Sequence, residues 1–68
     1  MLKDEILMLA RDEMDRRNKY YVDVAWFPKE NPDEKLETIM ALRQLELEGK
    51  IRVTDRAPHN IISCFVLT

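Results

Sequence analysis

At 68 residues, the chain is long enough for one domain with a small hydrophobic core, and we assign residues 1–68 to a single domain. Hydrophobic residues make up 46% of it and the formal net charge is −2, which excludes an intrinsically disordered chain of low hydrophobicity and high charge. With 13 acidic and 11 basic residues it lacks the overall positive charge typical of nucleic-acid-binding proteins, so DNA binding would need a local basic patch.

The first predicted element is a helix over Met1–Asn18. Its apolar residues recur at spacings of three and four and form one broad stripe, which consists of Leu2, Ile6, Leu7, Leu9, Ala10 and Met14. Acidic residues in the first turn and basic residues in the last suit the helix dipole. Asn18 is of a type that ends helices, which sets the predicted C-terminal boundary.

The next segment, Tyr20–Phe27, allows two interpretations. Aromatic and β-branched residues alternate with other residues along it, which favours a strand. The alternative is a short helix over Val24–Glu30 with Asp23 as its N-cap. Pro28 would remove one hydrogen bond of that helix and limit it to about one turn. We predict the strand.

A loop over Lys29–Pro32 leads to a second predicted helix, Asp33–Glu48, which begins with acidic residues and ends before Gly49. Successive residues of a helix are 100° apart, which places four residues on one side: Thr38, Ala41, Leu42 and Leu45. Three further apolar residues fall within about 40° of one another on the opposite side, with Arg43 among them: Leu36, Met40 and Leu47. We expect these three to form an exposed protein interface for a second copy or another protein. The alternative is that the first helix or the first strand covers them.

Two strands, Lys50–Asp55 and Asn60–Leu67, form a predicted hairpin around a turn over Arg56–His59, because Pro58 cannot donate to a strand ladder. The last strand is apolar on both faces, with Ile61, Phe65 and Leu67 on one and Ile62, Cys64 and Val66 on the other. Such a strand favours burial on both sides. We expect it at the centre of a three-stranded sheet or covered in a dimer, and the predicted fold is α+β with the order α–β–α–β–β.

The strongest local motif spans residues 41–51 and reads Ala-Leu-Arg-Gln-Leu-Glu-Leu-Glu-Gly-Lys-Ile. It resembles the end of the recognition helix in bacterial winged-helix regulators, where Ala-Leu-x-x-Leu-Glu-x-x-Gly-x-Ile recurs. The spacing has a physical basis, because the apolar positions share one helix face, Gly49 allows the positive φ that ends the helix, and Ile51 begins a buried strand. The resemblance covers roughly the C-terminal half of the chain, and more loosely the first helix. It implies a winged-helix-like domain with the hairpin as its wing.

The resemblance also implies a transcription-regulatory module that binds double-stranded DNA as a dimer. The candidate nucleic-acid-binding residues are polar or basic and lie around the second helix and the hairpin: Lys29, Lys35, Arg43, Arg52, Arg56, His59 and Asn60. Ordinary solubilising charge is the alternative for each. The chain departs from the family in two respects. Tyr20–Asn31 leaves little room for the usual second helix, and Asp33, Glu34 and Glu37 stand where the family often has Ser, Thr and basic residues.

No catalytic residue, metal site, cofactor or small-molecule substrate is expected. One histidine and one cysteine cannot complete a metal site, and a single glycine cannot form a phosphate-binding loop. Cys64 lies in an apolar segment, which is typical of an inert thiol. It has no cysteine partner, and no apolar run approaches the roughly 18 residues of a membrane span. We therefore expect a cytoplasmic, non-enzymatic module without a membrane partner.

Two hypotheses for function follow from these patterns. The first is a DNA-associated winged-helix module, which the 41–51 motif and the hairpin favour. The alternative is a protein-interaction module without nucleic-acid binding, which the net acidity and the apolar residues Leu36, Met40 and Leu47 favour. The family resemblance places the first slightly ahead.

Overall fold

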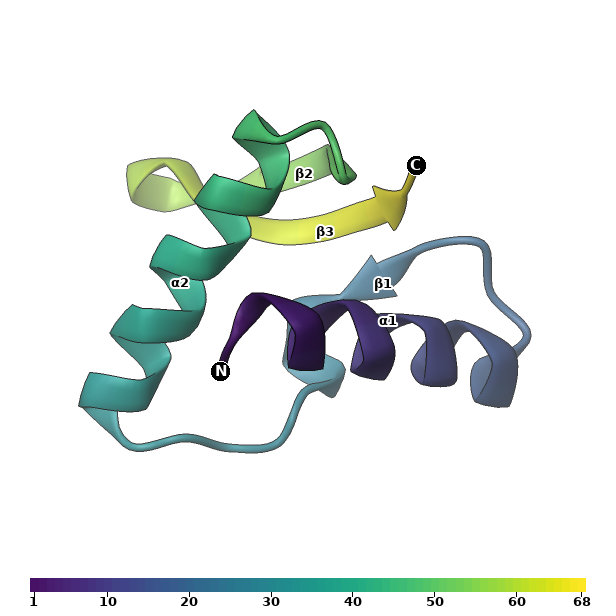
Figure 1. Ribbon diagram of the computed structural model, residues 1–68, viewed down its shortest axis with the longest axis horizontal. Helices are drawn as coiled ribbons and strands as arrows, with labels where there is room; N and C mark the ends of the chain where they lie inside the picture. The colour runs from purple at the N-terminus through teal and green to yellow at the C-terminus, as the bar shows by residue number, and fades with distance from the viewer.

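The computed structural model describes residues 1–68, and its elements form an α+β fold, as the sequence predicts. They are, in chain order, α1 (Lys3–Arg17), β1 (Val22–Asp23), the 3-10 turn η1 (Val24–Trp26), α2 (Pro32–Leu47), β2 (Ile51–Ala57), the 3-10 turn η2 (Pro58–Asn60) and β3 (Ile61–Leu67). In Figure 1, α1 runs across the front of β1, and α2 stands to one side at a steep angle to α1. Both helices contact the sheet and each other, so the core lies between them.

Helix α1 confirms the first predicted helix. Ile6 and Ala10, which are four residues apart and therefore share one face, are both 0% exposed. Asn18 adopts the left-handed conformation with φ of 54°. Its N–H donates to the carbonyl of Asp15, and this bond closes the last turn.

The segment after α1 corrects the prediction of a strand over Tyr20–Phe27. Only Val22 and Asp23 pair with β3, and Val22 is completely buried. The Asp23 carboxylate then accepts a hydrogen bond of 2.9 Å from the Ala25 N–H and caps η1. This side chain offers the backbone a partner that competes with strand pairing, so the chain turns instead of continuing extended. The alternative of a short helix capped by Asp23 describes this turn better.

Helix α2 agrees with the second predicted helix to within one residue at each end. The Asn31 side chain accepts from the Glu34 N–H at 2.8 Å, and Pro32 occupies the first turn, where its missing N–H costs nothing. Gly49 has a φ of 73°, and its N–H donates to the Glu46 carbonyl just past the end of the helix. The predicted stop is therefore confirmed.

The three strands form one antiparallel sheet in the order β1-β3-β2. Strand β3 is therefore central, which was one of the two positions expected for it. The hairpin turn lies later than predicted, because Arg56 and Ala57 still pair within β2 and the turn covers Pro58–Asn60. His59 and Asn60 take left-handed conformations with φ of 65° and 60°. These two residues reverse the chain after Pro58.

The strict alternation predicted for β3 is wrong in one respect. Ile62 and Phe65, which were expected on opposite faces, both belong to the core and are 4% and 0% exposed. The reason is irregular pairing with β2, whose register shifts between Val53 and Asp55 and again between Asp55 and Arg56. An unpaired residue at such a shift redirects the side chains that follow it.

The core joins all the main elements. Its largest fully buried side chains are Phe65, Ile6, Leu42, Leu45 and Val22. On α2, the buried side comprises Thr38, Leu42 and Leu45, with Ala41 packed against the core, as the helical spacing predicts. Neither helix has the length and apolar character needed to cross a membrane.

Candidate interaction surface and apolar cleft

The outward side of α2 carries three large apolar side chains, which we call the α2 stripe: Leu36, Met40 and Leu47. They are 58%, 62% and 82% exposed. Neither α1 nor β1 covers them, so the alternative of coverage within the domain is wrong. With Arg43, their spacing along the helix is four, three and four residues, which is the spacing of a helix-pairing seam.

The charge around the α2 stripe is asymmetric. Arg43 lies within the stripe, is exposed, and is absent from every ion pair of the chain. Asp33 and Glu37 are exposed and lie about 50–90° around the helix from the stripe, since each residue advances by 100°. The stripe thus offers an apolar row with one free cation and an acidic border.

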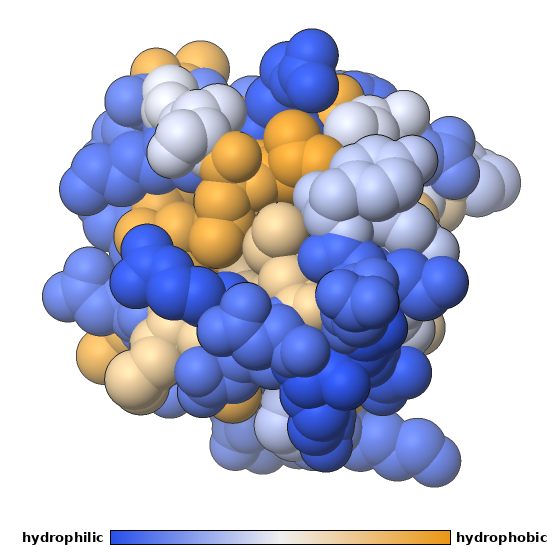
Figure 2. Space-filling model, turned by 90° about the vertical axis from the view of Figure 1, so that its right-hand side faces the viewer, coloured by the Kyte–Doolittle hydropathy of each residue, from blue (hydrophilic) through white to orange (hydrophobic).

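Other apolar side chains also reach the surface. Leu2, Met8 and Tyr20 are 62%, 59% and 80% exposed. Figure 2 shows an apolar area within a largely hydrophilic face of the molecule, on the side that lies at the right of Figure 1. Single exposed apolar side chains such as Leu2, Met8 and Tyr20 are normal for folded proteins. The α2 stripe differs because its members line up along one helix.

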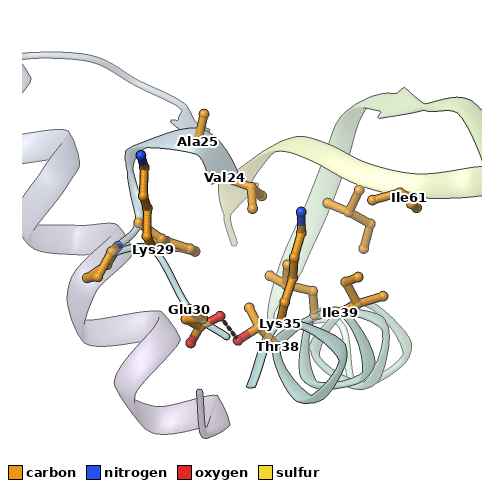
Figure 3. Close-up of a pocket in the computed structure, with 12 residues that line it drawn as sticks. Val24, Ala25, Lys29, Glu30, Lys35, Thr38, Ile39 and Ile61 are labelled. Atoms are coloured by element: carbon orange, nitrogen blue, oxygen red, sulfur yellow. Dashed lines mark hydrogen bonds between the residues drawn. The ribbon is translucent and has the colours of Figure 1, made fainter. Parts of the chain in front are cut away.

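A cleft of about 310 Å³ lies beside α2. It is formed by η1 and the loop after it, by α2 and by the start of β3, and its lining comprises Val24, Ala25, Phe27, Pro28, Lys29, Glu30, Lys35, Thr38, Ile39, Leu42, Ile61 and Ile62. In Figure 3, Lys29 and Lys35 stand on two sides of Val24, and Ile39 and Ile61 lie beyond Lys35. No stripe residue lines it.

A hydrogen-bonded group at the base of the cleft attaches the loop to α2. The Thr38 hydroxyl donates to Glu30 Oε2 at 2.7 Å, as the dashed line in Figure 3 marks. The N-terminal ammonium of Met1 donates to Thr38 Oγ1 at 2.7 Å and to Glu30 Oε1 at 3.3 Å. This ammonium compensates the charge of Glu30. Sequence reasoning missed the group, because Met1 lies 29 and 37 residues away from Glu30 and Thr38 in the chain.

A second polar network joins α1 to η1. Glu13 accepts hydrogen bonds from Arg16 and, at 2.8 Å, from Arg17. The Arg17 guanidinium lies 4.4 Å from the centroid of the Trp26 ring, a distance suited to a cation–π contact. These bonds, first from Arg16 and then from Arg17, lower the pKa of Glu13 from 4.5 to about 2. The spacing of three and four residues was the available sequence signal for this network.

The lowered pKa of Glu13 gives the stability of the domain a defined pH dependence. Its ionised form contributes stability fully above the unfolded-state pKa of 4.5, and this contribution is lost as pH falls toward 2. We expect Glu13→Gln to lower the thermal midpoint at pH 7 and to flatten its fall between pH 5 and pH 2.5, as followed by circular dichroism. Glu5→Gln is the control, since Glu5 is exposed and makes no ion pair. Parallel pH profiles of wild type and Glu13→Gln would contradict the assignment.

The seven residues singled out for nucleic acid lie on different elements. Lys29 and Lys35 line the cleft, and Arg43 lies within the α2 stripe. Arg52 is exposed on β2, and His59 and Asn60 are exposed in the hairpin turn. Arg56 is bound to Glu46 at 2.5 Å, so its charge is largely offset.

Similarity to known proteins does not assign a function to the α2 stripe or to the cleft. Comparison with known proteins finds no matching family model, no matching curated protein and no matching solved structure.

Proposed function

We propose that this chain is a small, non-enzymatic, winged-helix-like module that acts by pairing with another protein chain through the α2 stripe, with a second copy as its first partner. One observation carries the proposal: the same helix that buries Thr38, Leu42 and Leu45 leaves Leu36, Met40 and Leu47 exposed. Large apolar side chains lined up on one helix face mark protein-interaction sites.

The proposed pairing is antiparallel about a twofold axis. In that arrangement Leu36 faces Leu47 of the second copy, and Met40 faces Arg43 of the second copy. The same geometry brings Arg43 toward the exposed Glu37 of the second copy, which supplies the acidic partner that the chain itself does not give Arg43. A twofold interface uses the same patch on both copies, so this one surface is sufficient.

The strength of the pairing follows from approximate magnitudes. Burial of one large apolar side chain contributes about 1.5–3 kcal/mol, so six side chains contribute roughly 9–18 kcal/mol if they are fully buried. Association costs about 4–15 kcal/mol in lost freedom. The two ranges overlap, and the Arg43–Glu37 contact adds to the favourable side of this balance.

The experiment compares Met→Glu substitutions at two positions whose side chains are similarly exposed. Met40 and Met8 are 62% and 59% exposed, one on α2 and the other on α1. We expect the wild type and Met8→Glu to dimerise at high micromolar concentration in sedimentation equilibrium, and Met40→Glu to remain monomeric with an unchanged circular dichroism spectrum. A monomeric wild type, or equal weakening by both substitutions, would contradict the proposal.

The winged-helix-like architecture rests on the 41–51 motif. In its favour, Gly49 takes the positive φ that the motif requires, and the β2–β3 hairpin follows α2 at the position of a wing. The short turn η1 stands in place of the second helix of that family.

A single cysteine without a thiol partner favours a reducing, cytoplasmic setting for the module.

DNA association is the second candidate. The exposed Arg52, His59 and Asn60 of the hairpin favour it, because a wing contacts phosphates through such side chains. The exposed Asp33, Glu34 and Glu37 at the start of α2 oppose it, since they would repel the DNA backbone. A titration with random duplex at low salt decides: absence of binding at about 50 mM salt removes this candidate.

A further inference from the structure

The cleft beside α2 combines an apolar interior with unpaired positive charge. Phe27, Leu42 and Ile62 in its lining are 8%, 2% and 4% exposed, so its inner wall belongs to the core. Lys29 and Lys35 at its edge are exposed, and neither makes an ion pair. Glu30, the one acidic residue of the lining, is bound to the N-terminal ammonium and to Thr38. The cleft therefore keeps an excess of positive charge.

We infer that this cleft binds a small apolar monocarboxylate, with its hydrocarbon part against the inner wall and its carboxylate between Lys29 and Lys35. Ligand sites typically pair an apolar lining with a few polar groups that fix orientation. The volume of about 310 Å³ lies at the lower end of the range of about 300–1,000 Å³ that is typical of ligand sites, which suits a small ligand. Octanoate has this size and chemistry.

The arrangement of charge selects the class of ligand. A carboxylate can accept hydrogen bonds from two ammonium groups at once, and charge-assisted bonds are stronger than neutral ones. In Figure 3, the two lysine side chains extend in the same general direction from two sides of the cleft, so both sides of its opening carry positive charge. A neutral alcohol of equal chain length lacks this interaction, and an alkylammonium is repelled by it.

The experiment titrates the full chain with octanoate, octan-1-ol and octylammonium, and it follows the backbone amides by NMR. The Met40→Glu variant serves as the background, because it separates ligand binding from self-association through the α2 stripe. We expect octanoate to shift the amide signals of Ala25, Ile39 and Ile61 and to bind about tenfold more tightly than octan-1-ol. Octylammonium is expected to bind more weakly than either.

Three substitutions of exposed lysines assign the interaction. Lys29→Gln and Lys35→Gln should each weaken octanoate binding severalfold and leave octan-1-ol unchanged, whereas Lys19→Gln, outside the cleft, should change neither. All three positions are exposed, so the variants should fold. Equal affinity for octanoate and octan-1-ol, or octanoate binding unaffected by both cleft lysines, would overturn the inference.

Discussion

Replacement of Phe65 by alanine is expected to leave most molecules unfolded at 25 °C. Phe65 is 0% exposed on the central strand and is paired with Val22 of β1 and Val53 of β2. Its ring centroid lies 6.3 Å from that of Phe27, so it also holds the inner wall of the cleft. Truncation of a buried phenylalanine costs about 3–5 kcal/mol. A single core in a chain of this length rarely supplies more than about 3–5 kcal/mol in total.

Urea denaturation followed by circular dichroism measures this effect. We expect Phe65→Ala to lack a folded baseline, and Phe65→Leu, which retains much of the volume, to unfold cooperatively at lower urea than the wild type. Met8→Ala is the surface control outside the α2 stripe, since Met8 is 59% exposed, and its free energy of unfolding should change by no more than about 0.5 kcal/mol. A cooperative transition of Phe65→Ala within about 1 kcal/mol of the wild type would show that the core is elsewhere.

The elements that the sequence predicts well are those fixed by local patterns. Residue spacing predicts which side of α1 and α2 is buried, and Asn18 and Gly49 end the two helices by adopting left-handed conformations. The hairpin follows from its apolar strands and Pro58. The exposure of Leu36, Met40 and Leu47 also follows from the helical spacing, because Leu42 and Leu45 point the opposite way into the core.

The features that the sequence does not predict depend on competition or on distant contacts. Asp23 fits either a strand or an N-cap, and only the bond to the Ala25 N–H decides between them. The register shifts opposite β3 arise from pairing between two strands, and no single strand encodes them. The cleft requires η1, α2 and β3 to meet, so the sequence shows Lys29 and Lys35 as basic residues but does not predict their place beside an apolar wall.

Cysteine cross-linking along the α2 stripe is expected to trap one specific pair of residues. In the antiparallel arrangement Leu36 lies opposite Leu47 of the second copy. The two copies of Leu36 are then separated by about 16 Å along the helix, because eleven residues rise by about 1.5 Å each. A disulfide needs Cα atoms within about 7 Å, so only the mixed pair can form one. Cys64, the one native thiol, is replaced by serine in every variant.

The decisive measurement mixes the Leu36→Cys and Leu47→Cys chains under mild oxidation and quantifies each disulfide dimer by mass spectrometry. Pairing through α2 predicts that the mixed dimer exceeds either homodimer severalfold, and that Met8→Cys forms no preferred dimer with either chain. A statistical mixture of the three dimers, or the absence of cross-links at concentrations where the wild type associates, would contradict pairing through the outward side of α2.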